Sequence, residues 1–212
     1  MKLAIFGATG GAGQQLVAQS LAAGHEVVAF VRDPAKLNMR HERLTIVQGD
    51  VTDPAAVQRA IAGVDAVISA LNRRPNAKGR PITVGTCHIL AAMKKHGVRR
   101  LVFSAAPSAR DPQDTPDLRF RLMIGLVRLV APAAYDDMVG SAQAVRDSDT
   151  DWTIVRLPFP TDDPPTGRVR AGLVNKEAGT RISRADAAAV MLKEVQEARY
   201  LRQAPLISNW RG

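Results

Sequence analysis

A glycine-rich turn near the amino terminus constrains the fold of this chain more than any other feature. An apolar run at residues 3–6 precedes the turn, and a helix-like run at residues 14–23 follows it. A strand that enters a glycine turn and continues as a helix is typical of a cradle for the phosphates of a dinucleotide. The turn consists of Gly7, Ala8, Thr9, Gly10, Gly11, Ala12 and Gly13.

Three glycines of the turn have separate expected roles. Gly7 permits the tight turn, Gly10 lets the backbone approach a pyrophosphate because it has no Cβ, and Gly13 lets the helix lie close to the strand. The first N–H groups of the helix lack intrahelical partners and would point at the anion. A purely structural strand-to-helix turn is the alternative interpretation.

Strand-like and helix-like runs alternate along the chain, which predicts an α/β fold. We expect a Rossmann-type, doubly wound, mainly parallel sheet within a single domain of residues 1–212, with a short substrate-side portion at the carboxyl end. Ligands bind such sheets at the carboxyl ends of the strands. The expected strands are residues 3–6, 26–31, 44–48, 65–70, 100–104 and 152–156, with 205–208 as a last edge strand.

Arg32 closes the second expected strand, where an NAD-binding chain usually carries an acidic residue for the ribose. A guanidinium group at this place suits a 2′-phosphate, so we predict NADP(H) in preference to NAD(H). Asp33 follows directly, and a solvated surface pair of Arg32 and Asp33 is the alternative.

Other strand ends contribute further candidates. Asp50 follows the third strand and either accepts a hydrogen bond from an adenine amine or serves as a turn aspartate. Small residues after the fourth strand would leave room for the sugars of a cofactor.

The stretch 118–130 is apolar on nearly all sides and contains three arginines. We predict a buried helix under the substrate face; a wall of the substrate pocket and a self-association surface are the alternatives. Pro132 is expected to end it, and the next helix is expected at residues 136–147. Cys87 lies in an apolar helical stretch and is expected in the core.

Bulk composition excludes several classes of protein. The net charge is +9, but the basic residues are scattered and aromatic residues make up only 4%, so we expect no specific nucleic-acid partner. A single cysteine forms no disulfide within the chain and no metal cluster. We see no leader and no long apolar stretch, and therefore expect a cytoplasmic protein without a membrane anchor.

The order of motifs resembles the atypical short-chain dehydrogenase/reductase group of NAD(P)H-binding proteins, within the NmrA-like superfamily, and in particular biliverdin reductase B and the NADH-flavin reductases. The segments that carry the resemblance are residues 5–10, 31–34, 49–51, 65–68, 92–98, 151–158 and 182–186.

This resemblance implies a nicotinamide cofactor across the strand ends. The glycine turn would hold its pyrophosphate and Arg32 its 2′-phosphate. The adenine, the ribose and the nicotinamide would be bordered by Asp50, Val51, Ala70, Leu71, Asn72 and Pro158.

The chain departs from the larger superfamily at the proton relay. Where that superfamily has Tyr-x-x-x-Lys, Tyr135 is followed four residues later by Val139. The usual serine after the fifth strand is absent, so Ser104 and Tyr135 are only weak catalytic candidates. Hydride transfer to a conjugated acceptor such as a flavin needs no protein acid of this kind. The expected function is therefore an NAD(P)H-dependent reductase, with a non-catalytic NADP(H) sensor as the alternative.

Overall fold

The computed structural model describes residues 1–72, 77–115, 117–174 and 179–209. Within them, eight strands form one sheet in the order β3-β2-β1-β4-β5-β6-β10-β8, and the first seven of these strands run parallel. The strands are β1 (Lys2–Phe6), β2 (Glu26–Val31), β3 (Leu44–Gln48), β4 (Ala66–Ser69), β5 (Arg100–Ala105), β6 (Asp151–Arg156), β8 (Val169–Gly172) and β10 (Leu206–Asn209).

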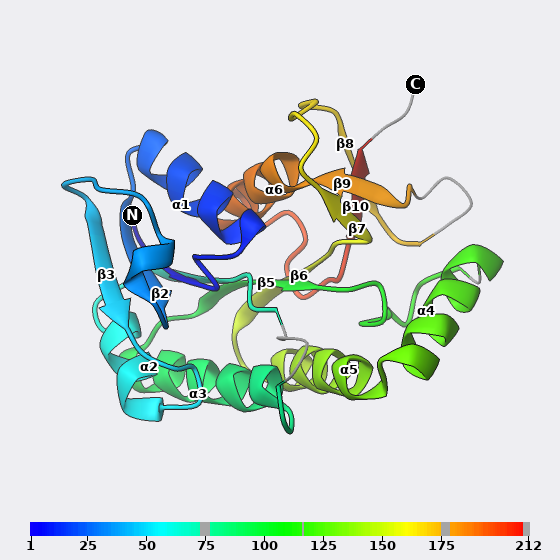
Figure 1. The fold of residues 1–212 in the computed structure, drawn as a ribbon, viewed down its shortest axis with the longest axis horizontal. Helices are drawn as coiled ribbons and strands as arrows, with labels where there is room; N and C mark the ends of the chain where they lie inside the picture. The colour runs from blue at the N-terminus through cyan, green and yellow to red at the C-terminus, as the bar shows by residue number, and fades with distance from the viewer. Residues whose placement is uncertain (73–76, 116, 175–178, 210–212) are drawn as a thin grey trace.

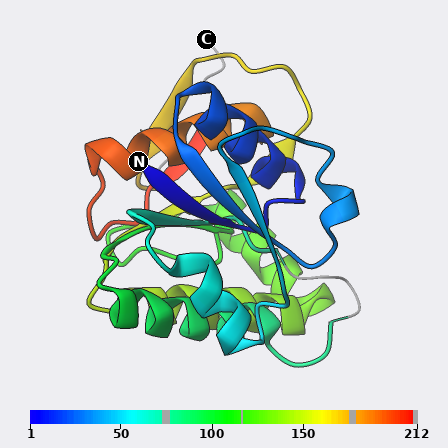
Figure 2. The same ribbon diagram turned by 90° about the vertical axis from the view of Figure 1, so that its left-hand side faces the viewer.

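Helices cover both faces of the sheet and make three layers (Figures 1 and 2). Helices α1 and α6 pack on one face, and α2, α3 and α5 pack on the other. Because the central strands are covered on both faces, they are nearly continuous apolar runs. The helices are α1 (Gly11–Ala22), α2 (Pro54–Ile61), α3 (Pro81–His96), α4 (Leu118–Val130), α5 (Pro132–Arg146) and α6 (Arg184–Glu197).

The predicted Rossmann-type α/β fold is confirmed by this strand order. The chain winds outward from β1 through β2 to β3 and then crosses to β4 on the other side of β1. The switch point between β1 and β4 leaves a crevice at the carboxyl ends of these strands, where doubly wound proteins bind their ligands.

The carboxyl-terminal part differs from prediction. Residues 205–208 were expected at the sheet edge, but β10 lies between β6 and β8. The edge strand is the antiparallel β8, whose short sequence Val-Arg-Ala-Gly lacks an apolar pattern that would indicate a strand. A separate pair of short parallel strands, β7 (Phe159–Thr161) and β9 (Arg181–Ser183), completes this region.

Helix α4 is not buried as predicted. Phe120 is its one buried side chain, whereas its outward side exposes leucines, among them Leu129 at 81%. The helix extends away from the sheet and contacts α5 (Figure 1), so an apolar composition does not bring it into the core. Pro132 opens α5 at its first turn, four residues before the predicted start, because proline needs no N–H bond there.

Cys87 is exposed rather than part of the core. The buried side of α3 is formed by other positions of the helix, including Gly85, Ile89 and Met93, and Cys87 lies outside that stripe. Gly97 adopts the left-handed conformation that ends α3. In the part of the chain that the structure describes, we find no helix that combines the length and the apolar character needed to cross a bilayer.

Candidate nucleotide-binding site

The glycine turn folds tightly between β1 and α1. Gly7 has a φ of +80°, and a Cβ there would lie 2.4 Å from the carbonyl oxygen of Ala70. A Cβ at Gly13 would lie 2.0 Å from the carbonyl oxygen of Gly7, so α1 begins directly against the turn. Both positions therefore require glycine for steric reasons.

The amino terminus of α1 has no side-chain cap among the described residues. Gly10 is the N-cap residue, and its own N–H donates to the carbonyl oxygen of Gly7 at 3.0 Å. The first N–H groups of the helix, from Gly11 onward, lie beyond the reach of intrahelical acceptors. Uncapped donors and the positive end of the helix dipole make this terminus suitable for a phosphate.

A cavity of about 510 Å³ opens beside this turn. Its volume falls in the range of small-molecule sites. It is bordered by the carboxyl ends of β1, β2 and β4, the segment after β3 and the start of α3. The predicted cofactor residues that line it are Gly7, Thr9, Gly10, Arg32, Asp50, Val51, Ala70, Leu71 and Asn72.

Five other predicted residues do not line this cavity. Ala8, Gly13 and Pro158 are buried, and Ala12 is half-buried on α1. Gly11 borders a different hollow together with Arg184. For Gly13 the structure supports the packing role that was predicted, through its contact with Gly7.

Arg32 and Asp33 have different surroundings. Arg32 is exposed and lines the cavity, whereas Asp33 caps the short 3₁₀ helix Pro34–Lys36 by accepting the N–H of Ala35 at 3.1 Å. Asp33 also lies 3.9 Å from the ammonium group of Lys36. The carboxylate that complicated the sequence interpretation is thus engaged in a local turn.

Asp50 forms a turn and also faces the cavity. Its Oδ1 accepts hydrogen bonds from the N–H and the hydroxyl of Thr52, at 2.9 and 2.7 Å. The following Val51 is buried against Gly85 of α3, and its carbonyl oxygen lies 3.1 Å from the Nδ1 of His88. Oδ1 of Asp50 thus has the role of a turn aspartate, as one of the two interpretations expected. Asp50 nevertheless borders the cavity.

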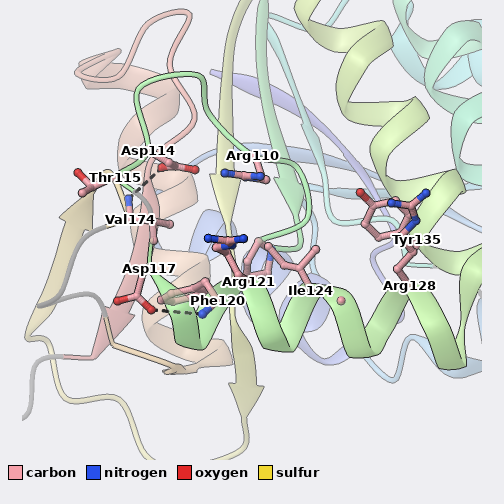
Figure 3. A pocket seen from close by; sticks show the side chains of 12 residues that line it. Arg110, Asp114, Thr115, Asp117, Phe120, Arg121, Ile124, Arg128, Tyr135 and Val174 are labelled. Atoms are coloured by element: carbon pink, nitrogen blue, oxygen red, sulfur yellow. Dashed lines mark hydrogen bonds between the residues drawn. The ribbon is translucent and has the colours of Figure 1, made fainter.

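The two weak catalytic candidates lie outside this cavity. Ser104 is 8% exposed within β5. Tyr135, in the first turn of α5, lies under the guanidinium group of Arg128, 5.8 Å from its ring centre, and lines a neighbouring pocket (Figure 3). Among the described residues, the lining of the nucleotide cavity includes neither Ser104 nor Tyr135, and the lining of the neighbouring pocket includes Tyr135 but no lysine.

Some residues of the site were missed by sequence reasoning. Phe30 and Lys78 line the cavity, and Ile82 borders it at the start of α3. Arg184, the first residue of α6, lies against Gly11: a Cβ on Gly11 would come within 2.5 Å of its Cδ. Two of these residues could have been found from the sequence. Phe30 stands directly before Val31 and Arg32, and Arg184 lies within the resembling segment 182–186.

The fold and the site together define a class. A parallel, doubly wound sheet with a glycine turn at an uncapped helix and a cavity at the switch point is a Rossmann-type nucleotide-binding domain. The chain belongs to the NAD(P)H-binding family, whose model matches residues 7–198. The NAD(P)H-binding family that the resemblance implied is thereby confirmed.

Known proteins share parts of the sequence or the whole fold. The chain is 34% identical over 114 residues to a 2-alkyl-3-oxoalkanoate reductase of Stenotrophomonas maltophilia, covering 51% of this chain and 34% of the relative. An anaerobilin reductase of Escherichia coli O157:H7 has the same fold (TM-score 0.79, 19% identity, 98% of this chain and 96% of that chain). So has a wide-type short-chain dehydrogenase/reductase of Veillonella parvula, solved in complex with NADP (TM-score 0.80, 17% identity, 100% and 95%).

The curated relatives are longer proteins. The chain spans less than half the length of the first three that it matches, between 34 and 45%. The similarity therefore concerns only a part of each of those proteins.

Proposed function

We propose that the chain is an NADPH-dependent reductase that transfers hydride to a planar conjugated acceptor such as a flavin. The observation that carries the proposal is the glycine cradle at the uncapped start of α1, which opens into the 510 Å³ cavity at the strand ends. Membership of the NAD(P)H-binding family supports the same reading.

The preference for NADPH rests on Arg32. Its guanidinium group belongs to the cavity wall, and Lys78 adds a second cation to that wall. Asp33, which would favour a ribose hydroxyl over a phosphate, caps the 3₁₀ helix instead. We therefore assign the 2′-phosphate to the neighbourhood of Arg32, where a planar fork of donors matches its oxygens.

The chemistry follows from what the chain's own residues can do. A bound nicotinamide would supply the hydride. The cradle would hold the pyrophosphate, and Ala70, Leu71 and Asn72 would border the ribose and the nicotinamide. The described residues that line the cavity include no tyrosine, and we propose an acceptor that delocalises the incoming charge and takes its proton from solvent. The protein then contributes mainly orientation.

The printed names of relatives agree with a reductase. The Stenotrophomonas relative reduces a 2-alkyl-3-oxoalkanoate and the Escherichia neighbour reduces anaerobilin, according to their names. We extend only the reductase class to this chain, and propose the planar acceptor from the absence of a Tyr–Lys pair at Tyr135 and Val139.

Steady-state kinetics test the proposal. Purified protein is mixed with NADPH and excess FMN, and the loss of reduced nicotinamide absorbance is followed against a protein-free control. Turnover above that control supports the reductase. Tight NADPH binding without turnover on flavins, bilins and quinones would contradict it and favour the NADP(H) sensor.

A further inference from the structure

A second pocket, of about 220 Å³, lies between α4, the start of α5 and the loop that follows β5. Its wall carries three guanidinium groups, and we call it the arginine pocket. Figure 3 shows Arg110 on the loop above α4, Arg121 on the helix, and Arg128 next to Tyr135. All three arginines are exposed, so an anion from solution can reach them.

The acidic residues of the arginine pocket are engaged elsewhere. Asp114 pairs with the buried Arg156, and Asp117 pairs with Arg119 at 3.1 Å. Among the residues that the structure describes, the ion pairs that we find include none for Arg110, Arg121 or Arg128. The pocket therefore presents a local excess of positive charge.

Apolar side chains also line the arginine pocket. Phe120 is 4% exposed and Ile124 is half-buried, and both line the pocket between the arginines. Pockets that combine apolar contact area with a few placed polar groups suit organic ligands rather than simple ions. The ligand expected here has an apolar body and an anionic group.

The arginine pocket is linked to the nucleotide cavity through α5. Tyr135 lines the pocket, and two residues further along the helix Asp137 accepts the N–H of Ile82 at 3.2 Å. Ile82 in turn borders the nucleotide cavity. Pro107 of the pocket follows β5 and Leu71 of the cavity follows β4, and these parallel strands are neighbours in the sheet. Both hollows thus open at the carboxyl edge of the sheet.

We propose that the arginine pocket binds the carboxylate or phosphate group of the acceptor, so that the substrates of this chain are acidic. The inference rests on the proposed reductase function and specifies its substrate class. Guanidinium groups bind both anions through paired N–H donors, which is the chemistry that the two sources share.

Acceptor pairs that differ only in charge test the proposal. FMN is compared with riboflavin for a phosphate, and biliverdin with its dimethyl ester for carboxylates. Binding of each is measured by calorimetry without NADPH, and NADPH binding is measured separately. We expect at least one charged acceptor to bind about tenfold more tightly than its neutral partner.

Variants locate the effect. The double variant Arg121→Gln and Arg128→Gln is expected to remove this discrimination while the neutral acceptor binds as before. Arg59→Gln, which removes an exposed guanidinium group on α2 outside the pocket wall, is the control and should retain it. Circular dichroism confirms that the variants are folded.

The outcomes separate the two proposals. Arginine-dependent binding without NADPH turnover supports the arginine pocket and contradicts the reductase. Turnover with equal affinity for charged and neutral acceptors supports the reductase and overturns the arginine pocket. Equal loss of both acceptors in the double variant, or no binding of any of the four, also overturns it.

Discussion

The guanidinium group of Arg156 in β6 forms a buried, two-pronged ion pair with the carboxylate of Asp114, which lies in the loop before α4. The Nη2–Oδ1 distance is 2.7 Å, and the side chains of Arg156 and Asp114 are 0% and 5% exposed. Asp114 also accepts the N–H of Val174 at 2.9 Å, and Arg156 donates to the carbonyl oxygen of Ala204 at 2.6 Å. The pair therefore joins β6, the loop before α4 and the segment after β8.

Asp114→Asn is expected to destabilise the fold by about 3–5 kcal/mol, because it leaves the charge of Arg156 buried without its partner. Chemical denaturation measures this free energy of unfolding. The control Glu197→Gln removes an exposed pair with Lys193, and its effect should stay below about 1 kcal/mol. Equal small effects for the two variants would contradict the structural role of the buried pair.

The same pair predicts a pH dependence. Burial alone would raise the pKa of Asp114, but the hydrogen bonds from Arg156 and from the N–H of Val174 outweigh it and lower the pKa. A lowered folded pKa adds stability above the unfolded value of about 3.9, and this stability is lost as the pH falls through the folded pKa. The free energy of unfolding, measured from about pH 6 down to about pH 2, should fall less for Asp114→Asn than for the wild type.

Alanine at Gly13 and at Gly10 should have opposite consequences. At Gly13 the new Cβ would lie 2.0 Å from the carbonyl oxygen of Gly7, so we expect a loss of about 1–3 kcal/mol in stability. At Gly10 the corresponding contact is an ordinary 3.4 Å, and the φ is −76°, so the fold should tolerate alanine. Gly10→Ala should nevertheless weaken NADPH binding about tenfold or more, because the Cβ obstructs the approach of the pyrophosphate. Unchanged NADPH affinity in a folded Gly10→Ala protein would contradict the cradle.

Asp137 holds the start of α3 from a neighbouring helix. Its carboxylate is fully buried and accepts the N–H groups of Ile82 and Thr83, at 3.2 and 2.8 Å. Asp137→Ala leaves these donors without an acceptor and should cost about 1–3 kcal/mol or more in thermal or chemical unfolding. The adjacent Asp136→Ala removes only an exposed contact with Arg80 at 3.8 Å and should cost less than about 1 kcal/mol. A larger effect at Asp136 would be inconsistent with this capping.

Arg32→Ala should distinguish the two nicotinamide cofactors. If Arg32 holds the 2′-phosphate, its loss should raise the Kd for NADPH about tenfold to a hundredfold and leave that for NADH nearly unchanged. Arg40→Ala removes the same charge outside the cavity wall and serves as the control. Equal loss for NADPH and NADH would remove the case for a 2′-phosphate contact.

Much of the fold was predictable because its signals are local. Apolar runs bounded by turn residues located β2 and β3 to the residue, and the glycine turn indicated the strand-to-helix junction. Exposure was less predictable: α4 is rich in leucine, yet it lies at the periphery, where none of the described helices and strands forms a second layer over it. Apolar composition reports the tendency of a helix to be buried, not whether the fold supplies a partner.

The parts of the site that escaped prediction depend on contacts between distant segments. Arg184 reaches Gly11 only because α6 packs beside α1, and Asp137 meets Thr83 only because α5 packs beside α3. Tertiary packing creates these relationships, and no spacing along the chain encodes them. The cavity residues at strand ends were accessible to sequence reasoning because parallel strands deliver their carboxyl ends to one edge.

Titration calorimetry with NADPH and NADH, performed on the wild type and on folded Gly10→Ala, tests the central claim most directly. We predict one nucleotide per chain, tighter binding of NADPH than of NADH, and a marked loss of affinity in the Gly10 variant. Absence of binding heat for both nucleotides, with no shift of the thermal unfolding temperature by either, would contradict it.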